Sequence, residues 1–284
     1  MSLLLYLFFI GLFAGLIGSV IGIGGGIIIV PFLSLLLKIP IHLAMGTSII
    51  AVLATSLASS IRFFKKDIIN VPLGLVMEIP TTAGSIIGSV SVAYLQSDVL
   101  FIVFGCFAFA CGVLTFIKDK FSKDKPSPAN TSGNAISAKT SIFDSEYFDE
   151  STNRRIYYRP KKVAAGSAVS VFAGLLSGLL SVGGGIIKVP AMNIIMDVPI
   201  KVATATSSYM IGITAVVSSI IYFYNGYINL DITIPAVMGV LIGATAGSFA
   251  AGRLKSRYIV FIMLIIFTLI GVLMLLRGFK ILNY

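Results

Sequence analysis

The sequence has little of the material from which soluble enzymes build catalytic and metal sites. Only 11% of its 284 residues are charged, and it contains eleven acidic residues, one histidine and two cysteines. One histidine and so few acids exclude a histidine-based metal cluster and leave no credible catalytic triad. Cys106 and Cys111 lie five residues apart in an apolar run, a spacing that matches no metal or redox motif. We therefore expect neither enzymatic activity nor a cofactor or metal.

Apolar residues are what the sequence has in excess. They make up 57% of the chain, and the mean hydropathy is +1.02. Runs such as Leu3–Ile21, Val99–Ile117 and Ile259–Leu276 approach the roughly 20 residues that a helix needs to cross about 30 Å of hydrocarbon. The first run has no Lys or Arg before it and no polar cleavage region after it, so we interpret it as a retained helix and not a signal peptide. The composition predicts an all-α polytopic protein of the cell membrane, surrounded by lipid.

The net charge of +10 does not indicate a nucleic-acid partner. Of the 32 formal charges, 16 fall between Lys118 and Lys162, and most of the others flank apolar runs. A nucleic-acid-binding protein would gather them on a face or along a helix. Membrane topology explains this distribution better.

Two halves of the chain repeat one pattern at a constant offset of 159 residues. The segment Phe13-Ala14-Gly15-Leu16 returns as Phe172-Ala173-Gly174-Leu175, and Gly24-Gly25-Gly26-Ile27-Ile28 returns as Gly183-Gly184-Gly185-Ile186-Ile187. Val-Pro, Pro-Ile, Thr-Ser, Ile-Asn and Gly-Ser pairs follow at the same offset without a gap. Shared membrane composition does not produce such runs, so the pattern indicates a duplication.

The repeat divides the chain into two membrane units and a linker. We expect a first transmembrane repeat over 1–120, a polar, disordered linker over 121–158, and a second repeat over 159–284. In each unit an apolar block of about 11 residues follows the glycines, roughly half a membrane crossing. Each unit therefore crosses five times if this block spans, or three times if it and the helix before it form a re-entrant pair.

Charged loops indicate that the two units have opposite orientations. In the first unit Arg62, Lys65 and Lys66 follow the third block, whereas in the second unit Arg253, Lys255 and Arg257 follow the fourth. Because Lys and Arg in short loops mark the cytoplasmic side, corresponding loops lie on opposite faces. The sequence thus predicts two inverted-topology helical repeats with a cytoplasmic linker and both termini outside, although Arg277 and Lys280 near the C-terminus disagree.

The two glycine triplets are the strongest candidates for a binding site. Consecutive glycines break a membrane helix, and the block that follows begins with a helix N-terminus of partial positive charge, which suits an anion. Broken helices at a repeat interface are common binding sites in secondary transporters. The alternative is that the glycines only permit tight packing. Hydroxyl pairs early in the third blocks can complete an anion's hydrogen bonds, or can bond helices together.

Two ionisable residues lie well inside apolar blocks, where such groups are functional candidates. Lys188 replaces Ile29 of the first unit and either attracts an anion or extends to a membrane interface. Glu78 either carries a coupling proton or partners Lys188. His42 lies in a turn and fits a loop histidine better than a proton relay. The candidate substrate-binding residues are Gly24, Gly25, Gly26, Thr47, Ser48, Gly183, Gly184, Gly185, Lys188, Thr206 and Ser207.

The doubled Gly-Gly-Gly-x-x-x-Val-Pro motif, at Gly24–Pro31 and Gly183–Pro190, resembles the TauE/SafE sulfite exporter family of membrane permeases. The resemblance covers both repeats and implies transport of a small, often sulfur-containing anion such as sulfite or an organosulfonate. Ser181 in place of Gly22, and Lys188 in place of Ile29, make the two half-sites unequal. We expect a secondary transporter for such an anion and hypothesise coupling to protons. The alternative is a non-transporting membrane sensor or scaffold that acts through the linker.

Overall fold

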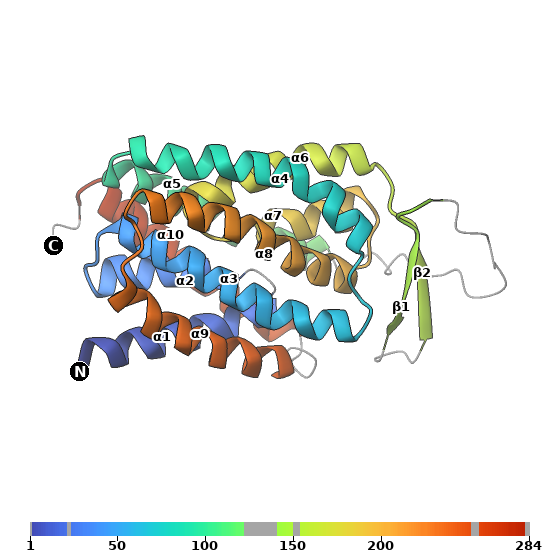
Figure 1. Cartoon of the computed structure of the whole chain (residues 1–284), viewed down its shortest axis with the longest axis horizontal. Coiled ribbons are helices and arrows are strands. Elements are labelled where there is room, and N and C mark those ends of the chain that lie inside the picture. The colour runs from blue at the N-terminus through green and yellow to red at the C-terminus, as the bar shows by residue number, and fades with distance from the viewer. Residues whose placement is uncertain (1, 22–23, 122–140, 150–153, 251–255, 282–284) are drawn as a thin grey trace.

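The computed structural model describes residues 2–21, 24–121, 141–149, 154–250 and 256–281, and these are almost entirely helical (Figure 1). Helices α3, α4, α6, α8 and α9 are long and apolar enough to cross a membrane, by length and composition. The prediction of an all-α polytopic membrane protein is confirmed. The elements of the first repeat are α1 Ser2–Ile21, α2 Gly26–Pro31, η1 Phe32–Leu36, α3 Ile41–Lys65, α4 Val71–Ser91, η2 Val92–Tyr94 and α5 Ser97–Phe121.

The second repeat contains the same succession of elements, and the counterpart of η2, at 251–253, lies outside the described residues. They are α6 Val163–Leu180, α7 Gly185–Pro190, η3 Ala191–Ile195, α8 Ile200–Tyr224, α9 Leu230–Ala250 and α10 Ser256–Gly278. In both repeats the six-residue helix after the glycines continues into a five-residue π-helical turn, η1 or η3. The two together reach about half the membrane thickness.

Each repeat packs mainly on the other one. Helix α1 lies along α9 and α4 lies along α6, and these two pairs exchange when each helix is replaced by its counterpart in the other repeat. The contacts are close because small residues face the partner backbone. A Cβ atom on Gly11 would collide with the carbonyl oxygen of Ala236, and one on Gly84 with that of Val171. The first repeat does not form a separate body.

Counterpart helices that touch one another run antiparallel. Gly46, near the start of α3, lies against Tyr227, just beyond the end of α8, and the Ser56 hydroxyl of α3 donates to the carbonyl oxygen of Ser208. Inverted repeats require this relationship. Their orientation in a membrane stays a prediction, as does the division into units at 1–120 and 159–284, and Arg253 and Lys255 lie outside the described residues.

The second half of the predicted linker differs from the expected disorder. Strands β1 (Ser145–Asp149) and β2 (Arg154–Tyr158) pair as an antiparallel hairpin at the end of the bundle opposite the start of α1 (Figure 1). Alternate positions face the bundle, as the period of a strand dictates. Tyr147 and Tyr158 are therefore buried against Leu73 and Met192. Residues 122–140 of the linker lie outside the described residues.

One asparagine fastens the hairpin to the helices. The Asn70 side-chain amide donates to the carbonyl oxygen of Phe143 at 2.9 Å and to the Tyr158 hydroxyl at 3.0 Å, while its side-chain oxygen caps α4 by accepting from the Leu73 N–H. Burial raises the pKa of the Tyr158 phenol, and hydrogen bonds with Ser145 and Asn70 partly offset the rise. The phenol therefore stays protonated at physiological pH.

Candidate functional site

In each repeat, two consecutive glycines with left-handed backbone angles separate the first helix from the second. Helix α1 ends at Ile21 and α2 begins at Gly26, and φ is 89° at Gly24 and 75° at Gly25. The counterparts Gly183 and Gly184 have φ values of 86° and 69°. Only glycine adopts such angles routinely. The repeated motif thus corresponds to a repeated backbone conformation.

These glycines also lie where no side chain fits. A Cβ atom on Gly25 would lie 2.7 Å from the carbonyl oxygen of Ala14, and one on Gly184 would lie 2.8 Å from that of Ala173. Ala14 and Ala173 are themselves counterparts at the 159-residue offset. The packing role considered for the glycines is therefore real at both positions, and it is compatible with a binding role for the same loops.

The two triplets approach one another across the interface between the repeats. The Ser48 hydroxyl of α3 donates to the carbonyl oxygen of Ser181 at 2.9 Å, with the carbonyl oxygen of Gly26 at 3.4 Å. A Cβ atom on Gly26 would collide with the same Ser181 carbonyl. Ser48 thus bridges the start of α2 and the segment before the second triplet. Gly22, the counterpart of Ser181, lies outside the described residues.

The other predicted hydroxyls have separate surroundings. The Thr47 hydroxyl lies 3.2 Å from that of Thr233, and the Thr206 hydroxyl accepts the backbone N–H of Asn70 at 3.1 Å. Both contacts join one repeat to the other, so they favour the interpretation that these two threonines hold helices together. Ser207 is buried, and its hydroxyl has no hydrogen-bond partner in the described part of the chain.

Lys188 and Glu78 meet inside the protein. Lys188 of α7 is fully buried, and its Nζ atom lies 3.5 Å from Oε2 of Glu78 on α4. Thr214 of α8 links the two residues, because its hydroxyl donates to Oε1 of Glu78 and accepts a 3.3 Å hydrogen bond from Lys188. Thr82 donates to the same carboxylate oxygen at 3.3 Å. Glu78 is thus the ion-pair partner of Lys188 in the structure, and the fully buried Lys188 does not extend to an interface.

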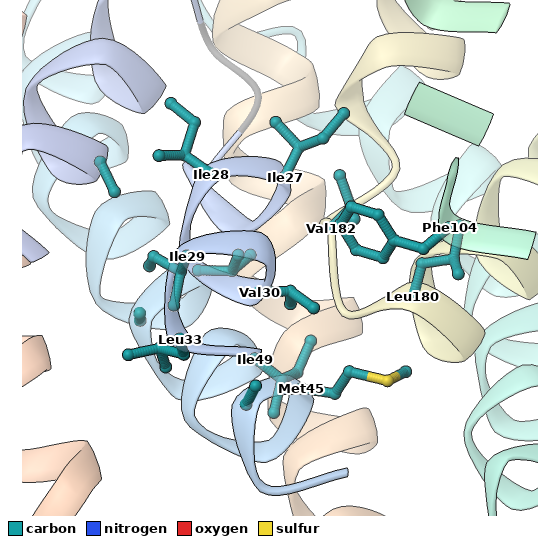
Figure 2. Close-up of a cluster of buried hydrophobic side chains, with 14 of the residues drawn as sticks. Ile27, Ile28, Ile29, Val30, Leu33, Met45, Ile49, Phe104, Leu180 and Val182 are labelled. Carbon is teal, nitrogen blue, oxygen red and sulfur yellow. The ribbon is translucent and has the colours of Figure 1, made fainter. Parts of the chain in front are cut away.

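The first repeat has no such ion pair at the equivalent place. The counterparts of Lys188, Thr214 and Glu78 are Ile29, Thr55 and Val237. Ile29 is buried, and Val237 packs against the same hydrophobic cluster, part of which Figure 2 shows. Only the hydroxyl is shared, and that of Thr55 bonds to the carbonyl oxygen of Ala51. The fold therefore accepts either an ion pair or aliphatic side chains at this position.

Comparison with known proteins decides the family. The model of the family described as "Sulfite exporter TauE/SafE" matches residues 7–274. The chain belongs to the TauE/SafE family. It is 30% identical over 276 residues to the "Probable membrane transporter protein YunE" of Bacillus subtilis, covering 95% of this chain and 96% of that protein. No solved structure matches the chain.

Two further relatives have names of the same kind. The chain is 25% identical over 248 residues to the "Probable membrane transporter protein YdhB" of Bacillus subtilis, covering 87% of this chain and 89% of that protein. It is 26% identical over 289 residues to the "Probable membrane transporter protein MJ0441" of Methanocaldococcus jannaschii, covering 96% of each. Together with the TauE/SafE match and the apolar helices, these relatives identify a multi-pass membrane transporter.

The remaining titratable candidates of this TauE/SafE protein lie apart from the ion pair or do not form a cluster. His42 lies in the first turn of α3 and not in a loop, so the expected loop position is wrong, and its ring centroid is 4.9 Å from that of the Tyr227 ring. Cys106 is exposed and Cys111 is buried, and neither forms a disulfide among the described residues. Within the described ranges, no three His, Cys, Asp or Glu side chains gather closely enough to hold a metal ion.

Thr214 is the site residue that the sequence analysis missed. A signal was present, because Thr55 and Thr214 are identical at the 159-residue offset inside otherwise apolar blocks. Its role depends on the packing of α4 against α8, which brings the carboxylate of one repeat to the hydroxyl of the other. The offset alone does not indicate this contact.

Proposed function

We propose that this protein is a secondary transporter that moves a small, sulfur-containing anion, such as sulfite or an organosulfonate, across the cell membrane. The observation that carries the proposal is the fully buried Lys188, three residues after the second glycine triplet and balanced by Glu78 of the other repeat. Burying an unpaired cation costs roughly several kcal/mol of desolvation free energy. Such a residue within an apolar block marks a substrate or ion pathway.

The ion pair gives the anion a place to bind. Lys188 and Glu78 are 3.5 Å apart, and Oε2 of Glu78 makes no hydrogen bond in the described part of the chain. An oxyanion that enters between α7 and α4 can replace this carboxylate oxygen as the partner of Lys188. Thr214 can then turn its hydroxyl from Glu78 to the anion, since one hydroxyl both donates and accepts.

Charge balance links this exchange to protons. When a singly charged anion neutralises Lys188, the Glu78 carboxylate is left buried and unpaired, which is unfavourable. Binding one proton at Glu78 restores a net charge of zero. We therefore propose that Glu78 is the coupling residue and that one proton enters with each negative charge.

The glycine loops and Ser48 supply the neutral part of the proposed site. In our proposal the anion lies between Gly24–Gly26 and Gly183–Gly185, which approach one another through Ser48 and Ser181. The loops bring backbone N–H groups close to a ligand without a side chain in the way. Ser207, buried and without a described partner, is retained as a binding candidate. The contacts of Thr47 and Thr206 favour a packing role for those two residues.

Topology follows from the charged loops. We propose that Arg62, Lys65 and the hairpin face the cytoplasm, and that the loop at Ser97 and the turn at Asn225 face outward. In the described structure, the hairpin and the end of α3 lie at one end of the bundle, and the starts of α1 and α5 lie at the other (Figure 1). This arrangement agrees with the charges of the loops after α3 and α8, whereas Arg277 and Lys280 at the end of α10 disagree with it.

A thermal-shift screen tests the proposed substrate class. Purified protein is heated in the presence of sulfite, sulfate, thiosulfate, sulfoacetate or simple carboxylates. A ligand at 100 times its Kd stabilises the folded form by about 2.7 kcal/mol. We expect sulfite or a sulfonate to raise the melting temperature and carboxylates not to do so. Stabilisation by carboxylates alone would contradict the proposed substrate.

A scaffold function is the second candidate, because the outer face of the hairpin presents aromatic side chains. Phe148 and Tyr157 are exposed, beside the surface ion pair of Glu146 and Arg155. Removing residues 122–140 and the hairpin together would also remove packing from the bundle. Replacing Phe148 by serine changes only the exposed face and keeps the hydrogen bond from the Tyr157 hydroxyl to Asp144. A transporter keeps its anion flux after this change, whereas a scaffold loses its partner.

A further inference from the structure

One face of α8 carries hydroxyl groups from the ion pair towards the end of the bundle opposite the hairpin. Thr214, Ser218 and Tyr222 follow one another at intervals of four residues, so they lie on the same side of the helix. All three side chains are fully buried. Thr214 contacts Glu78 and Lys188, and Tyr222 lies just before the end of α8. We call these three residues the polar face of α8.

The middle residue of the polar face lacks a hydrogen-bond partner among the described residues. The hydroxyl of Ser218 is buried and unpaired, and so is that of Ser177 on α6. Helical serines usually donate to a carbonyl oxygen of the preceding turn. Because a buried hydroxyl without a partner is unfavourable, these two serines mark positions that ordered water molecules can occupy.

The Tyr222 hydroxyl forms the outer end of the polar face. It donates to the carbonyl oxygen of Gly178 at 2.9 Å, and Gly178 follows Ser177 directly on α6. A phenol oxygen keeps lone pairs that accept hydrogen bonds, and its O–H group rotates. Tyr222 can therefore bond to a water molecule beside Ser218 as well as to the backbone of α6.

The first repeat does not have this arrangement. The counterparts of the polar face lie on α3 and are Thr55, Ser59 and Phe63. Thr55 and Ser59 each donate to a carbonyl oxygen of their own helix at 2.9 Å, and Phe63 has no hydroxyl. The duplicated fold thus forms without a row of available hydroxyls, and the row occurs where the helix contacts the ion pair.

Two titratable side chains continue the row from Tyr222 to the surface. The Tyr227 ring lies 6.1 Å from the Tyr222 ring and 4.9 Å from the His42 ring, centroid to centroid. Tyr227 and His42 are half-buried, at the end of the bundle where α3 begins and α8 ends (Figure 1). The topology proposed above places this end outside. A water molecule can pass a proton between polar groups that are too far apart for a direct hydrogen bond.

An apolar layer lies between the ion pair and the hairpin. It is a buried cluster that includes Leu73, Met77, Met192 and Met210 together with Tyr147 and Tyr158 of the hairpin. Met77 directly precedes Glu78, and Met210 is one turn of α8 before Thr214. This layer separates Glu78 from the hairpin end, whereas hydroxyls lead from Glu78 towards the outer end.

We propose that the polar face of α8 conducts a proton from His42 at the outer surface to Glu78. The proton enters at the imidazole, and Tyr227 and Tyr222 are the titratable side chains on the way. Each hydroxyl or water molecule accepts a proton on one side and releases one on the other, so the net change is one proton added to the Glu78 carboxylate. Among the described residues, Lys188 is the charged group that contacts this carboxylate. That the proton accompanies an anion rests on the proposed function.

The arrival of the proton at Glu78 can be measured without a transported substrate. Protein in phosphatidylcholine nanodiscs is exposed to a flash release of protons, and the infrared band of the protonated carboxyl group is followed in time. Glu78→Gln identifies the band, because this variant lacks it. We expect Tyr222→Phe and Ser218→Ala each to slow the rise of the band at least about tenfold. The first change uses the side chain of the counterpart Phe63, which the duplicated fold already contains.

Ser59→Ala and Tyr209→Phe are the matched controls. Ser59 is the counterpart of Ser218, but its hydroxyl is bonded within its own helix. Tyr209 is a phenol of α8 whose ring packs against Phe64, away from the polar face. Neither change should slow the band. Equal slowing in the controls and in the Ser218 and Tyr222 variants, or no slowing in the latter two, would overturn the proposal.

His42→Gln tests the entry of the route. It should slow the band at least about tenfold, and imidazole added to the solution should restore the rate, because a free imidazole can deliver a proton in place of the missing side chain. A purely structural defect would not respond to imidazole. An unchanged rate in His42→Gln, or slowing that imidazole does not relieve, would exclude His42 as the entry and overturn the proposal.

The infrared result and sulfite flux fail independently. If Tyr222→Phe does not fold, Ser218→Ala alone decides whether the route exists. Slowed protonation in a protein that moves no sulfite would support the route and contradict the proposed function. Sulfite flux with unslowed protonation would contradict the route alone. Absence of a Glu78 band at every pH at which the protein is folded would overturn the route and also the role of Glu78 as the coupling residue.

Discussion

The Nζ atom of Lys188 lies 3.5 Å from Oε2 of Glu78, and the two residues belong to different repeats of a duplicated chain. At the symmetry-related place, Ile29 and Val237 occupy the same positions. The duplicated fold thus shows which uncharged side chains can replace the ion pair. Each charge can be replaced by the side chain that the other half of the protein already uses.

The first prediction replaces each residue of the ion pair by the side chain of its counterpart. Lys188→Ile alone and Glu78→Val alone each leave one buried charge unpaired, so each should lower the free energy of unfolding by about 3 kcal/mol or more. The double variant should recover to within about 1 kcal/mol of the wild type, because a well-packed aliphatic pair replaces a buried ion pair at little cost. Denaturation of purified protein in detergent measures all four free energies. Additive losses in the double variant would show that the two charges do not interact.

A second prediction concerns the glycines. Gly25→Ala and Gly184→Ala should each cost about 3 kcal/mol, because the left-handed backbone and the collision with a carbonyl oxygen both oppose the new Cβ. Gly226 is the control, since its φ is 73° but nothing lies within 4 Å of a Cβ there. Gly226→Ala should cost about 1 kcal/mol from the backbone alone. Equal melting temperatures for all three variants would show that the collision between a new Cβ and a carbonyl oxygen does not destabilise the protein.

A third prediction concerns topology. Ser97 and Asn225 are exposed at the same end of the bundle, and Asp67 is exposed at the other end. In a Cys106→Ala, Cys111→Ala background, cysteines at Ser97 and Asn225 should react with an impermeant maleimide applied to intact cells. A cysteine at Asp67 should react only after the membrane is opened. Labelling of Ser97 without Asn225 would mean that the repeats are not inverted.

A fourth prediction separates the two counterpart asparagines. Asn70 caps α4 and bonds to Phe143 and Tyr158, whereas the side chain of Asn229 accepts only the N–H of Asp231 among the described residues. Asn70→Ala should cost about 2 to 3 kcal/mol and Asn229→Ala about 1 kcal/mol. Protease sensitivity of the hairpin gives a second readout, and it should rise only in Asn70→Ala. An unchanged hairpin in that variant would show that Tyr147 and Tyr158 hold it without Asn70.

The sequence predicts much of this structure because duplication turns single residues into pairs. The offset of 159 residues identified both triplets, the half-length blocks and the unequal pair of Ile29 and Lys188. Antiparallel packing of α3 on α8 and the contact between Ser48 and Ser181 depend on how the repeats meet, which the pattern of either repeat does not contain.

The hairpin was missed for a different reason. Its strands are only five residues long and carry charged side chains, so their composition resembles that of the polar linker around them. The aromatic and β-branched residues Tyr147, Phe148, Ile156, Tyr157 and Tyr158 were the available signal. The hairpin is stabilised by burial of its tyrosines against Leu73 of α4 and Met192 of η3, two residues that are distant in sequence. Such tertiary stabilisation cannot be derived from a local period.

Sulfite flux into proteoliposomes tests the central claim most directly. Wild-type protein and the Lys188→Ile, Glu78→Val variant are reconstituted at equal density, and uptake of sulfite is followed together with internal pH. The account predicts saturable flux with accompanying acidification in the wild type, and at least about a tenfold loss of both in the double variant, whose fold is preserved. Equal sulfite flux in the two proteins would contradict the assignment of Lys188 and Glu78 to the transport site.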